Sequence, residues 1–237
     1  MFSILSQHPQ IVAPCIKEPG FFYDREIVDG VKYGDFAAYH SIFPLPFRML
    51  PGKITFEANP EYLIYPECPQ RIYDYAPGMK LIVILRDPIA RAYSCWNMFR
   101  KFAISPNHKL RALAENRPFE DAITAEIRWI EQGERTRPWN YVRTGMYVEH
   151  LQRYFQYFPR NSMLISDYAD FLHTPEPCLA AVCQFLGIDS AFKFRIVHKN
   201  VSSYESKISQ KAVNILLSFY KPLNESLSRL LAREFKW

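Results

Sequence analysis

The sequence has 237 residues, 49% of them hydrophobic, which suffices for the core of one α/β domain and does not require a second. Lysine and arginine outnumber aspartate and glutamate by 29 − 24 = +5, and no basic run reaches the density of a nucleic-acid-binding arm. The charge balance therefore argues against a nucleic-acid partner. It suits an anionic cofactor or an anionic substrate equally well.

Cysteine spacing and the length of the hydrophobic runs limit the environment of the chain. The cysteines are Cys15, Cys68, Cys95, Cys178 and Cys183. They show neither C-x-x-C spacing nor histidines at zinc-ligand spacing, so we expect reduced structural thiols and no metal site. No apolar stretch approaches the roughly 20 residues of a membrane span, and no signal peptide is visible. We therefore expect no membrane segment in this chain and a reducing, cytoplasmic location.

The first third of the chain predicts two strands that end in charged residues. Met1 to His8 is predicted to be the end of a helix, because Pro9 stops it. Ile11 to Ile16 is predicted to be a buried strand with Lys17 and Glu18 at its carboxyl end, where α/β sheets bind their ligands. The other predicted elements are a helix within Val31 to Phe43, a strand over Lys53 to Ala58 and a helix over Pro66 to Tyr75.

The centre of the chain predicts a strand that turns directly into a helix. Leu81 to Leu85 is an uninterrupted apolar run, which is typical of a strand buried on both faces of a parallel sheet. Asp87 and Pro88 indicate a helix start, because an aspartate caps free N–H groups and a proline needs none. Arg86 at the strand end and Ser94 two turns into the helix suit a phosphate, which needs bidentate charge and a further donor. The alternative is a surface pair of Arg86 and Asp87, with Ser94 merely solvated.

The rest of the chain predicts helices, two lid-like loops and one short strand. Apolar periodicity predicts helices over Phe119 to Glu131, Met146 to Phe158, Pro175 to Leu186, Lys211 to Tyr220 and Leu223 to Phe235, and a strand over Met163 to Ile165. Ser105 to Pro118 and Gln132 to Tyr141 are predicted to be loops and are candidate lids over an acceptor cleft. Phe192 to Ser209 is a basic loop that contains Lys199.

Five segments carry a resemblance to a known family. They are R-D-P-I-A-R-A-Y-S at Arg86 to Ser94, L-S-Q-H-P-Q-I at Leu5 to Ile11, K-E-P-G-F-F at Lys17 to Phe22, E-A-N-P-E-Y-L at Glu57 to Leu63, and L-x-x-L-L-x-x-E-F-K-W at Leu227 to Trp237. Together they resemble the sulfotransferases that use 3′-phosphoadenylyl sulfate (PAPS), in the branch with the heparan sulfate enzymes and their bacterial relatives. The resemblance covers nearly the whole chain. It implies a single three-layer α/β/α domain with a central, mostly parallel sheet, of the P-loop nucleotide-kinase-like kind.

The resemblance also implies a reaction and a set of residues for it. PAPS would be the co-substrate, and its sulfuryl group would pass to an acceptor hydroxyl or amine, with a glycan as one acceptor class. Arg86 and Ser94 would hold the 3′-phosphate of the nucleotide. Glu18 would be the base that takes the acceptor's proton, and Lys199 in the late basic loop would contact the nucleotide. No metal is implied.

Three departures from the family pattern keep other interpretations open. Related enzymes have a Lys-x-Gly-Thr phosphate loop that would precede Met1. We therefore expect residues 1 to 237 to bind nucleotide weakly and to transfer no sulfuryl group, and a longer form to be more stable and active. Gly20 stands where related enzymes often have a histidine, and Ala58 where some have a lysine. The alternative is a noncatalytic relative that binds a nucleotide or a sulfated ligand. A phosphoryl-transfer enzyme is disfavoured, because no Walker loop or set of acidic metal ligands occurs.

Overall fold

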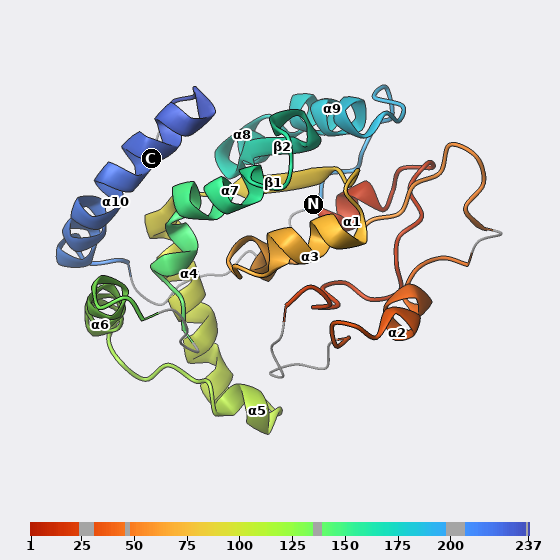
Figure 1. The fold of residues 1–237 in the computed structure, drawn as a ribbon. Helices are drawn as coiled ribbons and strands as arrows, with labels where there is room; N and C mark the ends of the chain where they lie inside the picture. The colour runs from red at the N-terminus through yellow and green to blue at the C-terminus, as the bar shows by residue number, and fades with distance from the viewer. Residues whose placement is uncertain (24–30, 46–47, 135–138, 198–206, 236) are drawn as a thin grey trace. The chain divides into compact units, whose positions relative to one another are not determined.

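A computed structural model describes residues 1–23, 31–45, 48–134, 139–197, 207–235 and 237 of the chain (Figure 1). Its α-helices are α1 (Phe2–Leu5), α2 (Phe36–Ser41), α3 (Cys68–Tyr75), α4 (Pro88–Lys101), α5 (His108–Arg111), α6 (Phe119–Glu131), α7 (Tyr147–Phe155), α8 (Tyr168–His173), α9 (Pro175–Leu186) and α10 (Gln210–Leu231). Its strands are β1 (Leu81–Leu85) and β2 (Met163–Asp167), and its short 3₁₀ helices are η2 (Pro60–Leu63), η3 (Phe102–Ile104), η4 (Arg143–Gly145) and η5 (Arg160–Ser162).

Residue contacts divide the chain into two compact units. The first unit comprises Met1–Ile84 and Arg153–Val201, and the second comprises Leu85–Gln152 and Ser202–Trp237. The chain passes from the first unit to the second at the last residue of β1 and returns within α7. That the chain forms a single domain stays a prediction.

The described ranges contain no membrane-spanning helix, no disulfide and no metal-binding cluster. No helix within these ranges is both long enough and apolar enough to cross a membrane. All five cysteines fall within them, and none forms a disulfide. No group of three or more histidine, cysteine, aspartate and glutamate side chains in these ranges is arranged to hold a metal ion.

Two predicted strands of the first unit form only a single bridge. Ile11 and Ile54 pair in parallel, with Val12 N–H donating to the Ile54 carbonyl at 2.9 Å and Ile54 N–H to the Gln10 carbonyl at 2.8 Å. The prediction of full strands over Ile11 to Ile16 and Lys53 to Ala58 is therefore wrong. Pro14 explains the early end, because proline has no N–H to donate to a ladder.

The strand β1 has its predicted bounds but is less buried than predicted. Only Leu85 is fully buried, and the four residues before it are half-buried. Within the described residues β1 pairs with β2 alone. The prediction of burial on both faces is wrong, because a two-stranded sheet provides few neighbouring side chains to cover each face.

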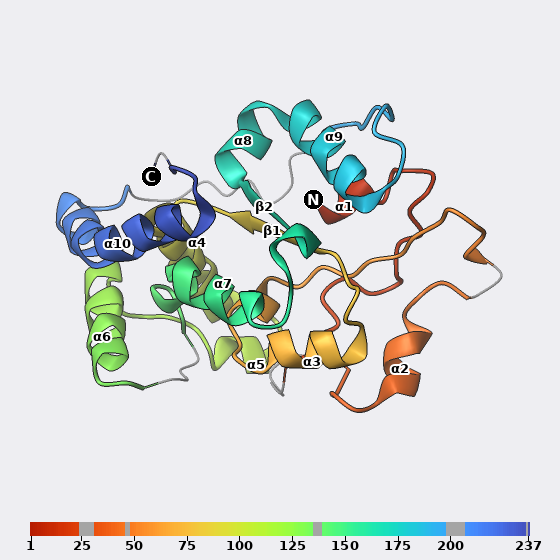
Figure 2. The same ribbon diagram turned by 45° about the horizontal axis from the view of Figure 1, so that its top comes forward.

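The first unit has an apolar core in which α1 packs with α9. The core contains Ile4, Leu5, Ile11, Leu179, Val182, Cys183 and Ile188. In Figures 1 and 2, α8 and α9 follow β2 and lie beside it. The predicted end of α9 is confirmed, because Gly187 has a left-handed φ of 78° and its N–H returns to the Cys183 carbonyl.

The second unit is built on the packing of α4, α6 and α10 (Figure 1). Its core includes Ala92, Tyr93, Trp96, Phe119, Ile123, Leu216 and Tyr220. The predicted bounds of α6 are confirmed, whereas the two predicted closing helices are one helix, α10, with Pro222 inside it. A proline in a helix interior costs about 3 kcal/mol. Buried Leu216, Tyr220 and Leu227 lie on both sides of Pro222, so packing holds the helix together across it.

Candidate active site

The start of α4 is capped by its own aspartate. Pro88 has no N–H, and the Asp87 carboxylate accepts hydrogen bonds from Ile89 N–H at 2.8 Å and Ala90 N–H at 3.4 Å. Arg91 N–H donates to the Asp87 carbonyl at 2.9 Å. The predicted cap is therefore confirmed, and the N–H groups of Ile89 and Ala90 already have a partner. An anion bound here must be held by side chains.

Arg86 and Ser94 are the two predicted phosphate ligands, and both belong to the second unit. Arg86 is half-buried and lies one residue before the helix cap. Its backbone carbonyl accepts a hydrogen bond from the Tyr147 hydroxyl at 2.8 Å. Ser94 is half-buried and lies about 9 Å along the axis of α4 from Pro88, at 1.5 Å per residue. A phosphate is much shorter than this separation, so the long Arg86 side chain has to extend along α4 for one phosphate to contact both residues.

The turn η4 supports this junction from the second unit. Thr144 accepts a hydrogen bond from the Arg91 guanidinium, and the Tyr220 hydroxyl donates to the Val142 carbonyl at 2.7 Å. Gly145 approaches so closely that a Cβ there would lie 2.6 Å from the Tyr220 hydroxyl. The same Cβ would lie 2.8 Å from a side-chain atom of Pro88, the first residue of α4. A small residue at position 145 thus allows η4 to pack against the start of α4.

Glu18, the predicted base, has a left-handed backbone. Its φ is 63°, and Pro19 follows it. A non-glycine residue in this region costs about 1 to 2 kcal/mol, and a following proline restricts the backbone further. The carboxylate is 43% exposed and forms an ion pair with Lys17. Strain of this kind persists where the surrounding structure enforces it, and it is enriched at functional sites.

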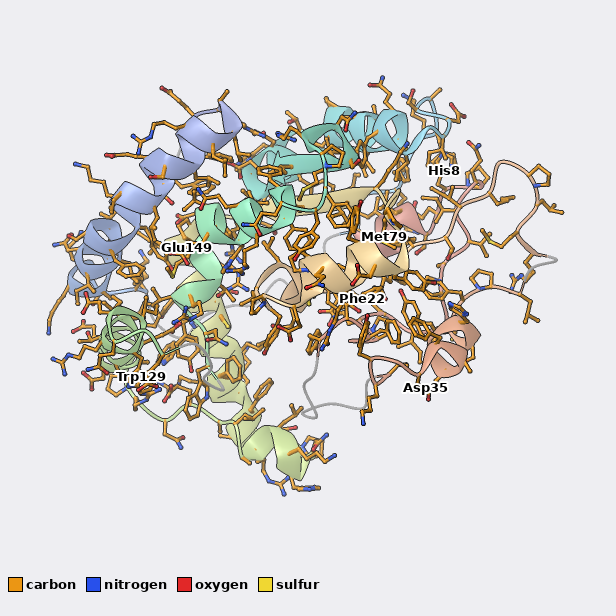
Figure 3. The ribbon with its side chains drawn as sticks, in the orientation of Figure 1. His8, Phe22, Asp35, Met79, Trp129 and Glu149 are labelled. Carbon is orange, nitrogen blue, oxygen red and sulfur yellow. The ribbon has the colours of Figure 1, made fainter. Side chains whose placement is uncertain are left out.

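Aromatic packing in the first unit holds the segment that follows Glu18. The Phe21 ring stacks on the Tyr39 ring with centroids 3.9 Å apart, and both rings are buried. The Phe22 carbonyl accepts hydrogen bonds from Cys68 Sγ at 3.2 Å and from the Arg71 guanidinium at 3.4 Å. Figure 3 labels Phe22 beside α3, which carries both of these donors. The turn that bears Glu18 is thus anchored on its carboxyl side.

A second carboxyl group, Glu57, lies in the first unit near Tyr39 and Tyr62. Burial raises its pKa from 4.5 to about 7, and the nearby hydroxyls of Tyr62 and Tyr39 offset this only in part. Within the described residues, Glu57 Oε2 has no hydrogen-bond partner of normal geometry. The sequence analysis placed Glu57 within a predicted strand and gave no sign of a buried acid.

The raised pKa of Glu57 predicts how Glu57→Gln changes stability with pH. The unfolded chain loses this proton near pH 4.5 and the folded chain near pH 7, so the parent loses stability as pH rises across that window. The neutral glutamine avoids this loss. We therefore expect Glu57→Gln to be more stable than the parent by about 1 to 3 kcal/mol at pH 8 and nearly equal to it at pH 4.5. Urea unfolding at both pH values measures this, and an equal difference at the two pH values would contradict the assignment.

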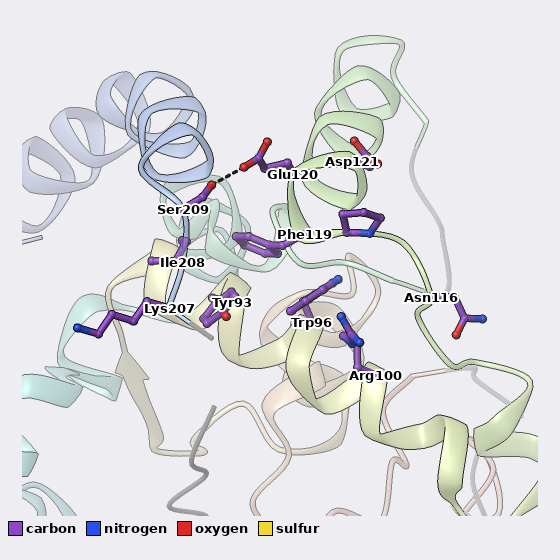
Figure 4. Close-up of a pocket in the computed structure, with 11 residues that line it drawn as sticks. Tyr93, Trp96, Arg100, Asn116, Phe119, Glu120, Asp121, Lys207, Ile208 and Ser209 are labelled. Atoms are coloured by element: carbon purple, nitrogen blue, oxygen red, sulfur yellow. Dashed lines mark hydrogen bonds between the residues drawn. The ribbon is translucent and has the colours of Figure 1, made fainter. Parts of the chain in front are cut away.

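A cavity of about 550 Å³ opens in the second unit, among α4, α6 and the start of α10 (Figure 4). Its lining includes Tyr93, Trp96, Arg100, Asn116, Phe119, Asp121 and Lys207. The Ser209 hydroxyl donates to the Glu120 carboxylate at its rim (Figure 4). The lining residues of α4 recur at three and four positions, which places them on a different face of α4 from Ser94. The cavity is thus separate from the predicted phosphate ligands.

The predicted site residues belong to different parts of the chain. Glu18 belongs to the first unit, whereas Arg86 and Ser94 belong to the second. Lys199 lies outside the described residues. Gly20 has a left-handed φ of 72°, and a Cβ there would lie 3.4 Å from the Tyr23 hydroxyl, so a histidine at this position would be strained.

A strand that leads directly into a capped helix, with an arginine at the junction, is typical of α/β enzymes, which bind their ligands beyond the carboxyl ends of the strands. The family described as "Sulfotransferase domain" matches residues 68–221, which is more than half of the chain. The chain belongs to this sulfotransferase family and is a transferase with its α/β, P-loop-like fold.

Curated relatives and a solved structure agree with this family. The chain is 27% identical over 264 residues to "Heparan sulfate glucosamine 3-O-sulfotransferase 6" of Mus musculus, with 100% of this chain and 69% of that protein covered. It is 28% identical over 261 residues to the Homo sapiens protein of the same name, with the same coverage. It is also similar to a sulfotransferase from Alicyclobacillus acidocaldarius, with a TM-score of 0.75, 26% identity, and 98% of this chain and 90% of that chain covered.

Proposed function

We propose that this sulfotransferase moves a sulfuryl group from PAPS to a hydroxyl or amine of a glycan. The observation that carries the proposal is the junction at Arg86, where the Asp87 carboxylate already occupies the helix N–H groups. Recognition of a phosphate at this end of α4 then depends on the Arg86 guanidinium and the Ser94 hydroxyl. These residue types suit the 3′-phosphate that distinguishes PAPS from other adenine nucleotides.

The reaction proposed for PAPS is an in-line displacement at sulfur. The acceptor oxygen or nitrogen forms a bond to sulfur as the bond from sulfur to the 5′-phosphate oxygen breaks, and adenosine 3′,5′-bisphosphate leaves. Glu18 takes the acceptor's proton, since a neutral hydroxyl is a weak nucleophile. Arg86 and Ser94 hold the departing nucleotide in place by its 3′-phosphate. Lys17 forms an ion pair with Glu18. For Glu18 to take the proton, the acceptor hydroxyl has to take the place of Lys17 beside the carboxylate.

A glycan acceptor is supported by the names of the relatives and by the space beside Glu18. The matched curated proteins are named for heparan sulfate glucosamine. Gly20 has no side chain, and its left-handed φ of 72° disfavours one. The acceptor therefore meets a less crowded surface beside Glu18 than it would in relatives with a histidine.

Replacing Arg86 with alanine tests the proposal through nucleotide discrimination. Loss of a bidentate, charge-assisted contact typically costs about 1.5 to 3 kcal/mol, so we expect adenosine 3′,5′-bisphosphate to bind about tenfold or more weakly. Adenosine 5′-phosphate should bind almost as before, because it lacks the 3′-phosphate. Isothermal titration calorimetry with both nucleotides measures the difference.

Arg100→Ala is the matched control for Arg86→Ala. Arg100 is an exposed arginine of α4 whose guanidinium lies over the Trp96 ring, and it lines the separate cavity. Its loss should leave the affinities for both nucleotides unchanged. Equal losses for the two nucleotides in Arg86→Ala, or the same discrimination defect in Arg100→Ala, would sink the assignment of the 3′-phosphate to Arg86.

A further inference from the structure

The segment after α10 turns back from the helix through a left-handed alanine. Ala232 has a φ of 48° and a ψ of 42°, and the Arg233 N–H bonds the Ser228 carbonyl at 3.1 Å. This is the hydrogen bond of a Schellman motif, which usually places glycine at the left-handed position. The backbone cost of an alanine here means that contacts made by the following residues stabilise the turn.

Aromatic residues after this turn pack on one another and on α7. The Trp237 ring meets the Tyr147 ring edge to face, with centroids 5.8 Å apart and planes at 73°. The Phe235 ring lies 4.6 Å from the Trp237 ring, and the Arg233 guanidinium lies over Phe235 at 5.1 Å. All of these residues belong to the second unit.

Tyr147 connects this aromatic group to Arg86. Its side chain is only 3% exposed, and its hydroxyl donates to the Arg86 carbonyl at 2.8 Å. That carbonyl belongs to the peptide bond that joins Arg86 to the capping residue Asp87. The orientation of this peptide therefore depends on Tyr147, whose ring is held on one side by Trp237.

A cavity lies beside the start of α4 and the Trp237 side chain. This cavity, of about 720 Å³, is lined by Asp87, Pro88 and Ile89 at the start of α4, by residues of α10, and by Phe235 and Trp237. Removing the indole would widen this cavity beside Tyr147. Water would then compete with the Arg86 carbonyl for the Tyr147 hydroxyl.

We propose that Trp237 is a positioning residue that acts through Tyr147 to hold Arg86 in the orientation that recognises a 3′-phosphate. This inference rests on the proposed function, because it assumes that Arg86 binds the 3′-phosphate. Trp237 touches neither nucleotide nor acceptor in this proposal. It sets how strongly the site prefers adenosine 3′,5′-bisphosphate over adenosine 5′-phosphate.

The test measures the affinities of the full 237-residue chain for both nucleotides in four variants. An edge-to-face aromatic pair contributes about 0.5 to 1.5 kcal/mol, so Trp237→Ala should weaken the bisphosphate about twofold to tenfold and leave the 5′-phosphate unchanged. Tyr147→Phe keeps the ring but removes the hydroxyl, and it should give a similar loss. The two changes together should lose no more than the larger single loss. Trp237→Phe, which restores an aromatic ring, should recover most of the affinity.

The outcomes separate this inference from the proposed function. Additive losses in the double variant, or equal losses for both nucleotides in Trp237→Ala, would overturn the inference. If Trp237→Ala does not fold, Tyr147→Phe decides, because it deletes one atom, and unchanged discrimination there would also overturn the inference. Arg86→Ala tests the function alone. Loss of discrimination in Arg86→Ala but not in the Trp237 and Tyr147 variants would refute only the positioning role.

Discussion

Glu18→Gln is expected to lower kcat by about 10² to 10⁴, the usual contribution of a general base. The amide has nearly the same shape as the carboxylate but cannot accept the proton that the acceptor must lose. Binding of adenosine 3′,5′-bisphosphate should not change, because the predicted nucleotide ligands are other residues. Steady-state sulfuryl transfer by an active form of the enzyme measures the rate, and calorimetry measures the nucleotide affinity.

Two controls distinguish loss of the catalytic base from other effects of Glu18→Gln. Both the parent and the variant have a non-glycine residue at the left-handed position, so their melting temperatures should agree closely. Lys17→Met removes the ion-pair partner of Glu18 but leaves the carboxylate, so most of the turnover should remain. Near-normal turnover in Glu18→Gln, with PAPS and acceptor saturating, would show that another group takes the proton.

Gly145→Ala is expected to destabilise the chain by about 3 kcal/mol, the upper end for inserting a methyl group into a well-packed site. The new Cβ would lie 2.6 Å from the Tyr220 hydroxyl and 2.8 Å from a Pro88 side-chain atom. Tyr220 is buried and its hydroxyl holds the Val142 carbonyl, so it has little room to move. Urea unfolding of the parent and the variant measures the loss.

Gly78→Ala is the matched control for Gly145→Ala. A Cβ at Gly78 meets nothing within 4 Å, and Gly78 does not have a left-handed φ. Its stability should stay the same or rise slightly, because alanine restricts the unfolded chain. Adding Tyr220→Phe to Gly145→Ala should recover part of the loss, since it removes the nearest atom. A Gly145→Ala chain as stable as the parent would show that η4 moves away from α4 at little cost.

The elements around the site were predicted best where a local signal marks both ends. Leu81 to Leu85 is bounded by charge on both sides, and Asp87 with Pro88 specifies where α4 begins. The predicted helix over Phe119 to Glu131 is confirmed at both bounds, as is the one that ends before Gly187. In these segments hydrophobic period and capping residues agree, so no tertiary information was needed.

The errors arise where a local signal was overlooked or where tertiary contacts outweigh local sequence. The apolar run at Ile11 to Ile16 predicted a strand, but Pro14 leaves no donor to continue the ladder beyond one bridge. Two closing helices were predicted, Lys211 to Tyr220 and Leu223 to Phe235, but burial of α10 on both sides of Pro222 keeps one helix. Packing energies of this kind are not visible in a hydrophobic pattern, because the pattern does not say which residues far apart in sequence meet.

The candidate site was predicted in its residues but not in its geometry. Spacing alone left Arg86 and Ser94 open between a phosphate site and a solvated surface, and the family resemblance favoured the first. The sequence predicted that Asp87 caps the start of α4, and the structure confirms it, but the sequence could not show that Tyr147 fixes the Arg86 carbonyl. That contact depends on side-chain orientation and joins residues 61 positions apart in sequence.

The left-handed backbone at Glu18 places stability and chemistry in opposition at one position. Glycine at this φ of 63° would avoid a cost of about 1 to 2 kcal/mol that glutamate bears. With Glu18 as the proposed base, a laboratory selection for heat resistance alone would favour loss of the carboxylate, and the selected variants would bind nucleotide but not transfer the sulfuryl group. Only a selection that requires sulfuryl transfer would retain the acid. Variants from the two selections should therefore differ first in the residue at position 18.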